Sequence, residues 1–136
     1  MFTHWYLWAR LGLVRTAYKV RAYPTAEQAA LLARTFGCVR VVWNRTLADR
    51  QAAYATEKRT VSYQQADAAL TGWKRLPELE WLNEVSSVPL QQTLRHQQAA
   101  FAAFFAKRGR YPRFKSRNGR QSATLRIHVL QLQGEE

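Results

Sequence analysis

The chain has 136 residues, 47% of them hydrophobic and 12% aromatic, which is enough apolar material for one domain with a core. Its 21 Lys and Arg residues against 9 Asp and Glu residues give a formal net charge of +12 at pH 7. Such a balance lies outside ordinary enzyme composition and is typical of domains that bind phosphate-rich polyanions. The single cysteine, Cys38, excludes an internal disulfide and a cysteine-based zinc site, and it fits a reducing cytoplasmic setting.

The positive charge is concentrated toward the C-terminal end of the chain. Residues 1–84 hold 12 basic and 7 acidic side chains, whereas residues 85–134 hold 9 basic side chains and no acidic one. A face kept charged for solubility normally mixes both signs, so the pattern favours a nucleic acid over a solvated face or an anionic membrane. We predict that the partner is DNA, structured RNA or both, bound through the phosphate backbone.

Residues 1–15 are aromatic and apolar, but they lack the pattern of a targeting segment. Arg10 interrupts the apolar run, and neither a basic n-region nor a small-residue cleavage site surrounds it. No stretch of the chain approaches the roughly 18 uncharged apolar residues that a membrane-spanning helix requires. We interpret residues 1–15 as an atypical N-terminal extension, and we expect a cytoplasmic, nucleoid-associated protein that engages no membrane.

Residues 16–24 predict a short β-strand. Polar and apolar side chains alternate over residues 18–23, which places Lys19 and Arg21 on one face. Pro24 then ends the strand.

A capping box opens the helical part of the chain. The Thr25 hydroxyl can accept from the amide of Gln28, whose side chain can reach back to the Thr25 amide. An Ala- and Leu-rich run follows, and Gly37 is placed to end it in the left-handed conformation before helical spacing resumes. The sequence therefore predicts helices over residues 26–36 and about 39–56, joined at Gly37 as a helix-turn-helix-like hairpin.

Two further helices are predicted. Ser62 and Gln65 form a second capping box, for a helix that ends near Lys74. A packed loop leads to a last helix, which Ser87 caps and which ends near Ala106. Six apolar side chains at inward spacings are expected to share one helical core: Phe36, Trp43, Leu90, Leu94, Phe101 and Phe105.

Residues 107–120 change character, because the run KRGRYPRFKSRNGR has 7 basic residues in 14, with two glycines and one proline. This composition opposes a helix and favours an extended segment that follows phosphates. The alternative is a floppy basic linker, although Tyr111 and Phe114 have the character of anchors. The predicted fold class is mainly α, with a helical bundle that contains a helix-turn-helix-like hairpin over residues 25–106. Short β-strands are expected on both sides of it: the N-terminal strand and one in the C-terminal basic segment, residues 107–122.

Four separated blocks of this sequence resemble, in order and spacing, the N-terminal region of the TnpB/OrfB proteins of insertion sequences. That region is usually labelled a transposase helix-turn-helix domain. The resemblance covers about residues 16–122. The blocks are YKVRAYPT from Tyr18, FGCVRVVWN from Phe36, PLQQTLR from Pro89 and YPRFKS from Tyr111.

The resemblance implies a nucleic-acid-binding function. Full-length members resemble type V CRISPR effectors, in which an N-terminal part grips guide RNA and target DNA and a later RuvC-like domain cuts DNA with magnesium. We expect an N-terminal module or truncated copy of such a nuclease, without its catalytic domain and zinc ribbon. Members usually begin near Thr16, so residues 1–15 depart from the family. The divergent C-terminus, residues 123–136, also departs from it. Apolar and polar residues alternate weakly over residues 125–132, which suggests one strand there.

The candidate binding residues are all polar, and all but one are basic. Arg40, Asn44 and Arg45 lie within about one and a half turns of the second predicted helix, where a recognition helix would present them to bases or phosphates. The alternative is an ordinary hairpin in which Arg40 and Asn44 pair with neighbouring backbone. The full set is Lys19, Arg21, Arg40, Asn44, Arg45, Arg95, Lys107, Arg108, Arg110, Arg113, Lys115, Arg117 and Arg120.

Nothing in the sequence indicates a complete active site. A two-metal nuclease requires several converging carboxylates, whereas the acidic residues here are scattered, and His4, His96 and His128 are far apart. We expect no catalytic residue, metal site or cofactor. Two other functions remain open: a stand-alone helix-turn-helix regulator that binds a palindrome as a dimer, and a helical interaction protein that ignores nucleic acid at about 0.15 M salt.

Overall fold

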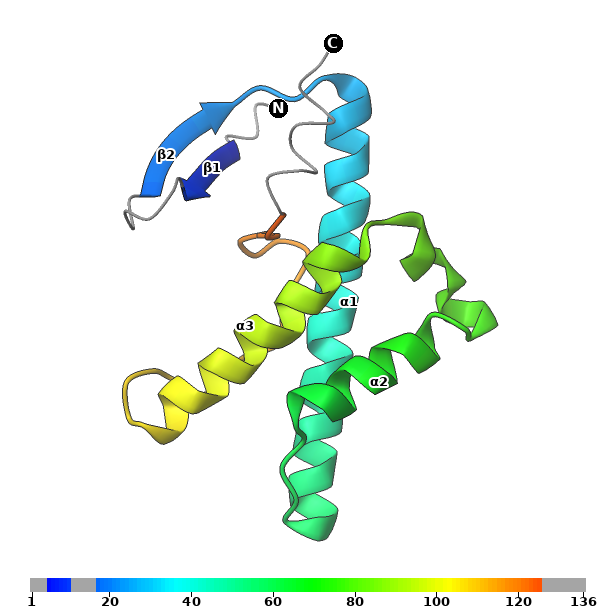
Figure 1. The fold of residues 1–136 in the computed structure, drawn as a ribbon, viewed down its shortest axis with the longest axis vertical. Helices are drawn as coiled ribbons and strands as arrows, with labels where there is room; N and C mark the ends of the chain where they lie inside the picture. Colours follow the sequence, from blue (N-terminus) through cyan, green and yellow to red (C-terminus); the bar gives the residue numbers. More distant parts are fainter. Residues whose placement is uncertain (1–4, 11–16, 126–136) are drawn as a thin grey trace. The chain divides into compact units, whose positions relative to one another are not determined.

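The structure is a computed structural model in which residues 5–10 and 17–125 are described. The chain divides into two compact units, Met1–Leu32 and Ala33–Glu136. Its elements are β1 (Trp5–Arg10), β2 (Ala17–Ala22), α1 (Ala26–Glu57), α2 (Tyr63–Trp73), the 3₁₀ helix η1 (Pro77–Glu84) and α3 (Ser87–Phe105) (Figure 1). Helices dominate the described residues, which confirms the mainly α class.

The first unit contains a two-stranded antiparallel sheet. β1 pairs with β2 in a register that sets Trp5 opposite Ala22 and Arg10 opposite Ala17. β2 confirms the strand expected over residues 16–24, whereas β1 lies in a segment that the sequence marked only as an extension. Aromatic residues are common in strands, and pairing gives the backbone groups of each strand partners that neither strand has alone.

Helix α1 begins at the capping box that the sequence predicts. The backbone amide of Gln28 donates to Thr25 Oγ1 at 3.3 Å, and the amide of Thr25 donates to Gln28 Oε1 at 2.9 Å. Amides in the first turn have no intrahelical partner, so these two bonds fix where the helix starts.

The turn expected at Gly37 is wrong, because α1 continues as one helix of 32 residues. Gly37 does not take the left-handed conformation, and a glycine inside a helix costs only about 1 kcal/mol relative to alanine. Phe36 and Val39, on either side of it, are buried. Burying such a side chain contributes about 1.5–3 kcal/mol, so packing on both sides of Gly37 outweighs the local preference to end the helix.

Helix α2 begins at the second predicted capping box. The amide of Gln65 donates to Ser62 Oγ at 3.2 Å, and the amide of Ser62 donates to Gln65 Oε1 at 2.9 Å. The packed loop expected next is the helix η1, in which Leu79 and Leu82 are buried and Trp81 is 37% exposed. The segment therefore packs through its two leucines.

Helix α3 is capped by Ser86 and not by Ser87. Ser86 Oγ accepts from the amide of Val88 at 3.3 Å, and the helix proper begins at Ser87. Adjacent serines offer the same hydroxyl, so sequence alone does not decide which of them is the cap. Pro89 lies in the first turn, where its missing amide removes no intrahelical bond.

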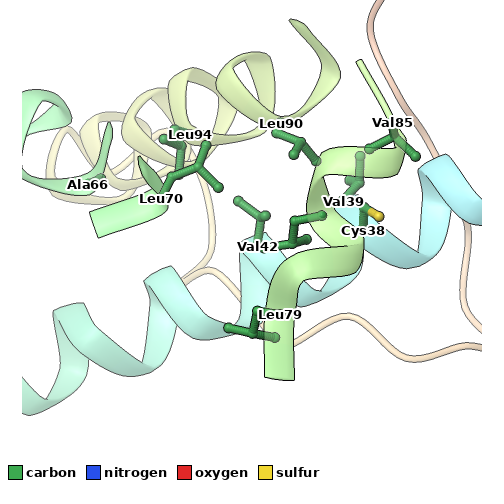
Figure 2. Close-up of a cluster of buried hydrophobic side chains, with 10 residues drawn as sticks. Cys38, Val39, Val42, Ala66, Leu70, Leu79, Val85, Leu90 and Leu94 are labelled. Carbon is green, nitrogen blue, oxygen red and sulfur yellow. The ribbon is translucent and has the colours of Figure 1, made fainter. Parts of the chain in front are cut away.

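The main hydrophobic core lies where α1, α2, η1 and α3 meet (Figure 2). Leu90 and Leu94 lie in it as expected, and Phe36 and Phe101 are buried outside this cluster. The buried members of the cluster are Cys38, Val39, Val42, Ala66, Leu70, Leu79, Leu82, Val85, Leu90 and Leu94.

Two of the six expected core residues are not core residues. Trp43 is only half-buried, and Phe105 is 68% exposed. Helical spacing sets Phe105 in line with Phe101, but α3 continues past its crossing with α1 (Figure 1). Its last turn therefore has no helix to pack against in the described part of the chain.

A polar interlock joins α1 to α3 beside this core. Arg50 donates from Nε to Gln97 Oε1 at 3.1 Å, from Nη2 to Gln98 Oε1 at 2.8 Å and from Nη1 to the carbonyl of Val61 at 2.8 Å. The Gln97 side chain is fully buried and donates to the Trp43 carbonyl at 3.0 Å. Burial lowers the pKa of the Arg50 guanidinium, but the group stays protonated because the ordinary pKa of arginine lies far above neutral pH.

Candidate nucleic-acid interface

The basic segment starts by folding back over the end of α3. The amide of Lys107 donates to the Phe104 carbonyl at 3.0 Å, and that of Arg108 to the Ala103 carbonyl at 2.8 Å. Lys107 itself has φ 59°. This is the Schellman arrangement, whose left-handed position usually holds glycine. The chain therefore reverses sharply, and residues 109–121 run back toward α1.

The basic segment forms no strand in its described residues, so the strand expected there is wrong. The Arg113 carbonyl accepts from Trp43 Nε1 at 2.8 Å, which is a bond to a helix side chain instead of to a strand. Pro112 is buried and has no amide to donate. Strand geometry requires a partner strand, and side chains of α1 take its place here.

Asn44 holds the segment by both groups of its amide. Its Nδ2 donates to the carbonyl of Lys115 at 2.9 Å, and its Oδ1 accepts from the amide of Lys115 at 2.8 Å. The Lys115 ammonium lies 4.7 Å from the centre of the Trp43 ring. Residues 113–115 are therefore fixed to one face of α1, so this stretch is not a flexible linker.

A single glutamine organises the following turn. Gln121 Nε2 donates to the carbonyls of Ser116, Arg117 and Gly119 at 2.9, 3.2 and 2.8 Å, while its Oε1 accepts from Arg40 Nη1 at 3.1 Å. The Gly119 amide also donates to the Ser116 carbonyl at 3.2 Å. The turn thus has a defined shape that leaves Arg117 exposed. No local sequence signal marks Gln121 for this role.

The cations of the segment are mostly open to solvent. Lys115 is half-buried, and burial lowers its pKa. Burial, and to a lesser degree the charge of Lys115, lowers the pKa of His96, so His96 adds no charge near pH 7. Over the described part of the chain no salt bridge neutralises the exposed members of the segment, which are Lys107, Arg108, Arg110, Arg113, Arg117 and Arg120.

Two of the remaining candidate residues, Arg45 and Arg95, lie over aromatic rings of α2. The guanidinium of Arg45 lies 5.4 Å from the Trp73 ring, and that of Arg95 lies 4.7 Å from the Tyr63 ring. Lys19 and Arg21 lie on β2, in the other unit. The structure therefore gathers the seven basic residues of 107–120 and places Arg40 and Asn44 behind them as supports.

Neither a metal site nor a membrane span accompanies this surface in residues 5–10 and 17–125. No three His, Cys, Asp or Glu side chains come close enough there to hold an ion together. No helix among the same residues combines the length and apolarity needed to cross a bilayer.

The fold and this surface define a basic, mainly helical domain. A family model described as "Helix-turn-helix domain", of the OrfB_IS605 type, matches residues 14–59. The chain is 32% identical over 122 residues to the "Virulence protein VsdF" of Salmonella dublin, with 76% of this chain and 95% of that protein covered. The chain belongs to the TnpB/OrfB family, as its sequence blocks predict.

Two longer relatives carry the name "Putative RNA-guided DNA endonuclease". One, from Streptomyces pristinaespiralis, is 64% identical over 104 residues, which are 76% of this chain and 26% of that protein. The other, InsQ of Escherichia coli K12, is 35% identical over 101 residues, which are 74% of this chain and 25% of that protein. This chain thus spans about a quarter of the length of these two relatives.

Proposed function

We propose that this chain is a nucleic-acid-binding module and that residues 107–120 are its phosphate-contacting segment. The observation that carries the proposal is a strip of seven cations whose backbone is held against α1 by Trp43 and Asn44 and, through Gln121, by Arg40. Cations displayed on an ordered backbone bind a polyanion at a lower cost in conformational entropy than a flexible tail does. Each phosphate that they neutralise releases condensed counterions, which is the main source of affinity in such complexes.

Within this module the candidate residues divide into two roles. The exposed arginines of the segment contact phosphates, and this binding is blind to base sequence. Arg40 and Asn44 are positioning residues, because their polar atoms already bond to Gln121 and to the backbone of Lys115. Lys19, Arg21, Arg45 and Arg95 are secondary contacts outside the segment.

The partner is DNA, structured RNA or both. The names of the two longer relatives include an RNA guide and a DNA substrate. The same names denote endonucleases, and we propose that this module binds nucleic acid without cutting it. Cleavage by metal ions needs converging carboxylates, and residues 5–10 and 17–125 bring no such group together.

Binding measured against salt concentration tests this function. The test variant replaces Arg110, Arg113, Arg117 and Arg120 by Gln, and the control variant replaces four exposed cations elsewhere, Arg34, Lys58, Arg59 and Arg75. Both variants lose four positive charges; of these eight residues, only Arg59 of the control set forms a salt bridge in the described residues, with Glu57. We expect the segment variant to bind all duplex sequences more weakly, with the slope of log K against log salt reduced by about 0.9 for each phosphate that is no longer neutralised.

Two results would overturn the proposal. Equal losses in the two variants would show that net charge acts without a defined surface. A wild-type chain that binds neither duplex DNA nor an RNA–DNA hybrid at about 0.15 M salt would be a helical interaction protein instead.

A further inference from the structure

The C-terminal end of α3 carries aromatic rings that the core does not use. Phe105 is 68% exposed, although a phenylalanine gains about 1.5–3 kcal/mol when it is fully buried. Its ring stacks on that of Phe101 with centroids 6.4 Å apart and meets Phe104 edge-on at 5.4 Å. The ring is therefore braced from the protein side while most of its surface faces solvent.

The loop after the helix holds these rings in place. Tyr111 meets Phe101 edge-on at 5.5 Å and Phe104 edge-on at 5.2 Å. Gly109 lies so close to the last turn that a β-carbon added to it would stand 3.4 Å from Ala103 Cβ. Phe104, Phe105 and Tyr111, supported by Phe101, thus form a rigid aromatic platform.

The charge around the platform narrows the choice of partner. Lys107, Arg108 and Arg110 lie between its two chain segments and are exposed, and residues 85–134 contain no acidic side chain. A partner must supply flat apolar faces and repeated negative charge within a few ångströms of each other. Unpaired nucleotides have both, because a phosphate accompanies every base.

We propose that the aromatic platform stacks the bases of single-stranded nucleic acid, whose phosphates Arg108 and Arg110 contact. A duplex is not the ligand, because its bases already stack on each other and present only their edges. The inference rests on the proposed function and adds a ligand class and a site to it. RNA and DNA offer the same base faces, so both are tested.

Single strands with and without bases separate the contribution of the bases from that of the phosphates. The 136-residue chain is titrated with oligo(dT), with oligo(rU) and with a strand of equal length and charge that carries abasic spacers. Stacking on an aromatic side chain is worth about 1–3 kcal/mol per base, so Phe105→Ala should weaken binding of oligo(dT) and oligo(rU) about 5- to 150-fold. Binding of the abasic strand should not change, because Phe105 contacts no phosphate.

Two further variants separate stacking from other effects. Phe105→Trp should retain affinity because indole also stacks, whereas Phe105→Leu should lose it although the side chain stays apolar. Tyr54→Ala is the control, since Tyr54 is an aromatic residue that is 58% exposed in the last turn of α1, outside the platform, and it should change nothing.

The outcomes distinguish this inference from the proposed function. If Phe105→Ala leaves all three affinities unchanged, or weakens all three equally, the platform is not a base-stacking site, while weaker duplex binding by the four-arginine variant still supports phosphate binding. The same conclusion follows if Phe105→Leu binds like wild type, because an apolar side chain without a ring would then serve equally well. If the wild-type chain binds duplex DNA but none of the strands, this inference fails and the proposed function stands; if it binds neither duplex DNA nor any strand, both fail.

Discussion

Asn44 and Lys115, which are 71 residues apart, are joined by two hydrogen bonds between a side-chain amide and a backbone. Both hydrogen-bonding groups of the Asn44 amide are used, at 2.9 and 2.8 Å. An asparagine that reads adenine needs the same two groups for the base. In the folded chain Asn44 therefore holds the basic segment in place, and its amide is not available to bind a base.

Replacing Asn44 by Ala should weaken nucleic-acid binding for every sequence alike. The change leaves the amide and carbonyl of Lys115 without their partners, which costs about 1–3 kcal/mol of stability when such groups are buried and less here, where they are partly exposed. Thermal unfolding and binding to matched and scrambled duplexes give the two readouts. Asn118→Ala, on the exposed turn, is the control. A change confined to one base-pair position would instead mark Asn44 as a base reader.

Gln121→Glu should loosen the turn without losing the bond to Arg40. A carboxylate still accepts from the Arg40 guanidinium, but it cannot donate to the carbonyls that Gln121 now serves. We expect faster hydrogen exchange at the Gly119 amide and weaker binding of duplex DNA. Gln121→Ala should behave similarly, and a wild-type exchange rate in both variants would show that the turn needs no glutamine.

Lys107→Gly should stabilise the domain. Lys107 has φ 59°, a left-handed conformation that costs a non-glycine residue about 1–2 kcal/mol. The greater unfolded-state entropy of glycine offsets about 0.4–1 kcal/mol of that relief, which leaves a small net gain. The thermal midpoint should rise by a few degrees in a domain of this size, roughly in line with 4–8 °C per kcal/mol. Lys107→Ala removes the same charge without relieving the backbone, so a rise in both variants would assign the effect to charge.

Stability should fall as the pH drops through the titration of His96. Burial, assisted by the charge of Lys115, lowers the folded-state pKa of His96 below its ordinary 6.5, so the unfolded chain binds the proton more readily. The contribution is complete above that ordinary pKa and is lost as the pH falls through it toward the folded-state value. The thermal midpoint of wild type minus that of His96→Gln, measured between about pH 7.5 and pH 5, should therefore decrease with acidity. A constant difference would contradict this linkage.

Leu94→Ala and Phe105→Ala should differ sharply although both change α3. Leu94 is fully buried in the core, where truncation to alanine costs about 2–5 kcal/mol. Phe105 is mostly exposed, and surface substitutions usually stay within about 0.5 kcal/mol. Denaturant unfolding measures both, and equal losses of stability would refute the assignment of the core.

The features of this fold that local chemistry decides were predictable from the sequence. Both capping boxes depend on residues three positions apart, so Thr25 with Gln28 and Ser62 with Gln65 follow from residue type and spacing alone. The turn at Gly37 failed because the packing that keeps α1 helical comes from elements distant in the sequence. Local propensity is a weak prior against such packing.

The charge of the candidate site was predictable from the sequence, but the contacts that hold the basic segment in place were not. The density of basic residues over 107–120 is visible in the sequence, whereas the partners that fix them are about 70 or more residues away, as for Trp43 with Arg113 and Arg40 with Gln121. A single sequence carries no signal for such pairs. Phe105 was misplaced for a related reason, because helical periodicity gives the direction of a side chain but not whether another element reaches it.

The hydrogen bonds of Arg50 should make the stability of the fold less sensitive to salt than the binding of nucleic acid is. Its guanidinium donates to neutral oxygens, those of the Gln97 and Gln98 amides and of the Val61 carbonyl. Ions screen attraction between opposite charges much more than they disturb a half-buried bond to an amide oxygen. The joint between α1 and α3 should therefore hold at ionic strengths that strip a polyanion from the surface, so salt can dissociate the complex and leave an intact protein ready to bind again.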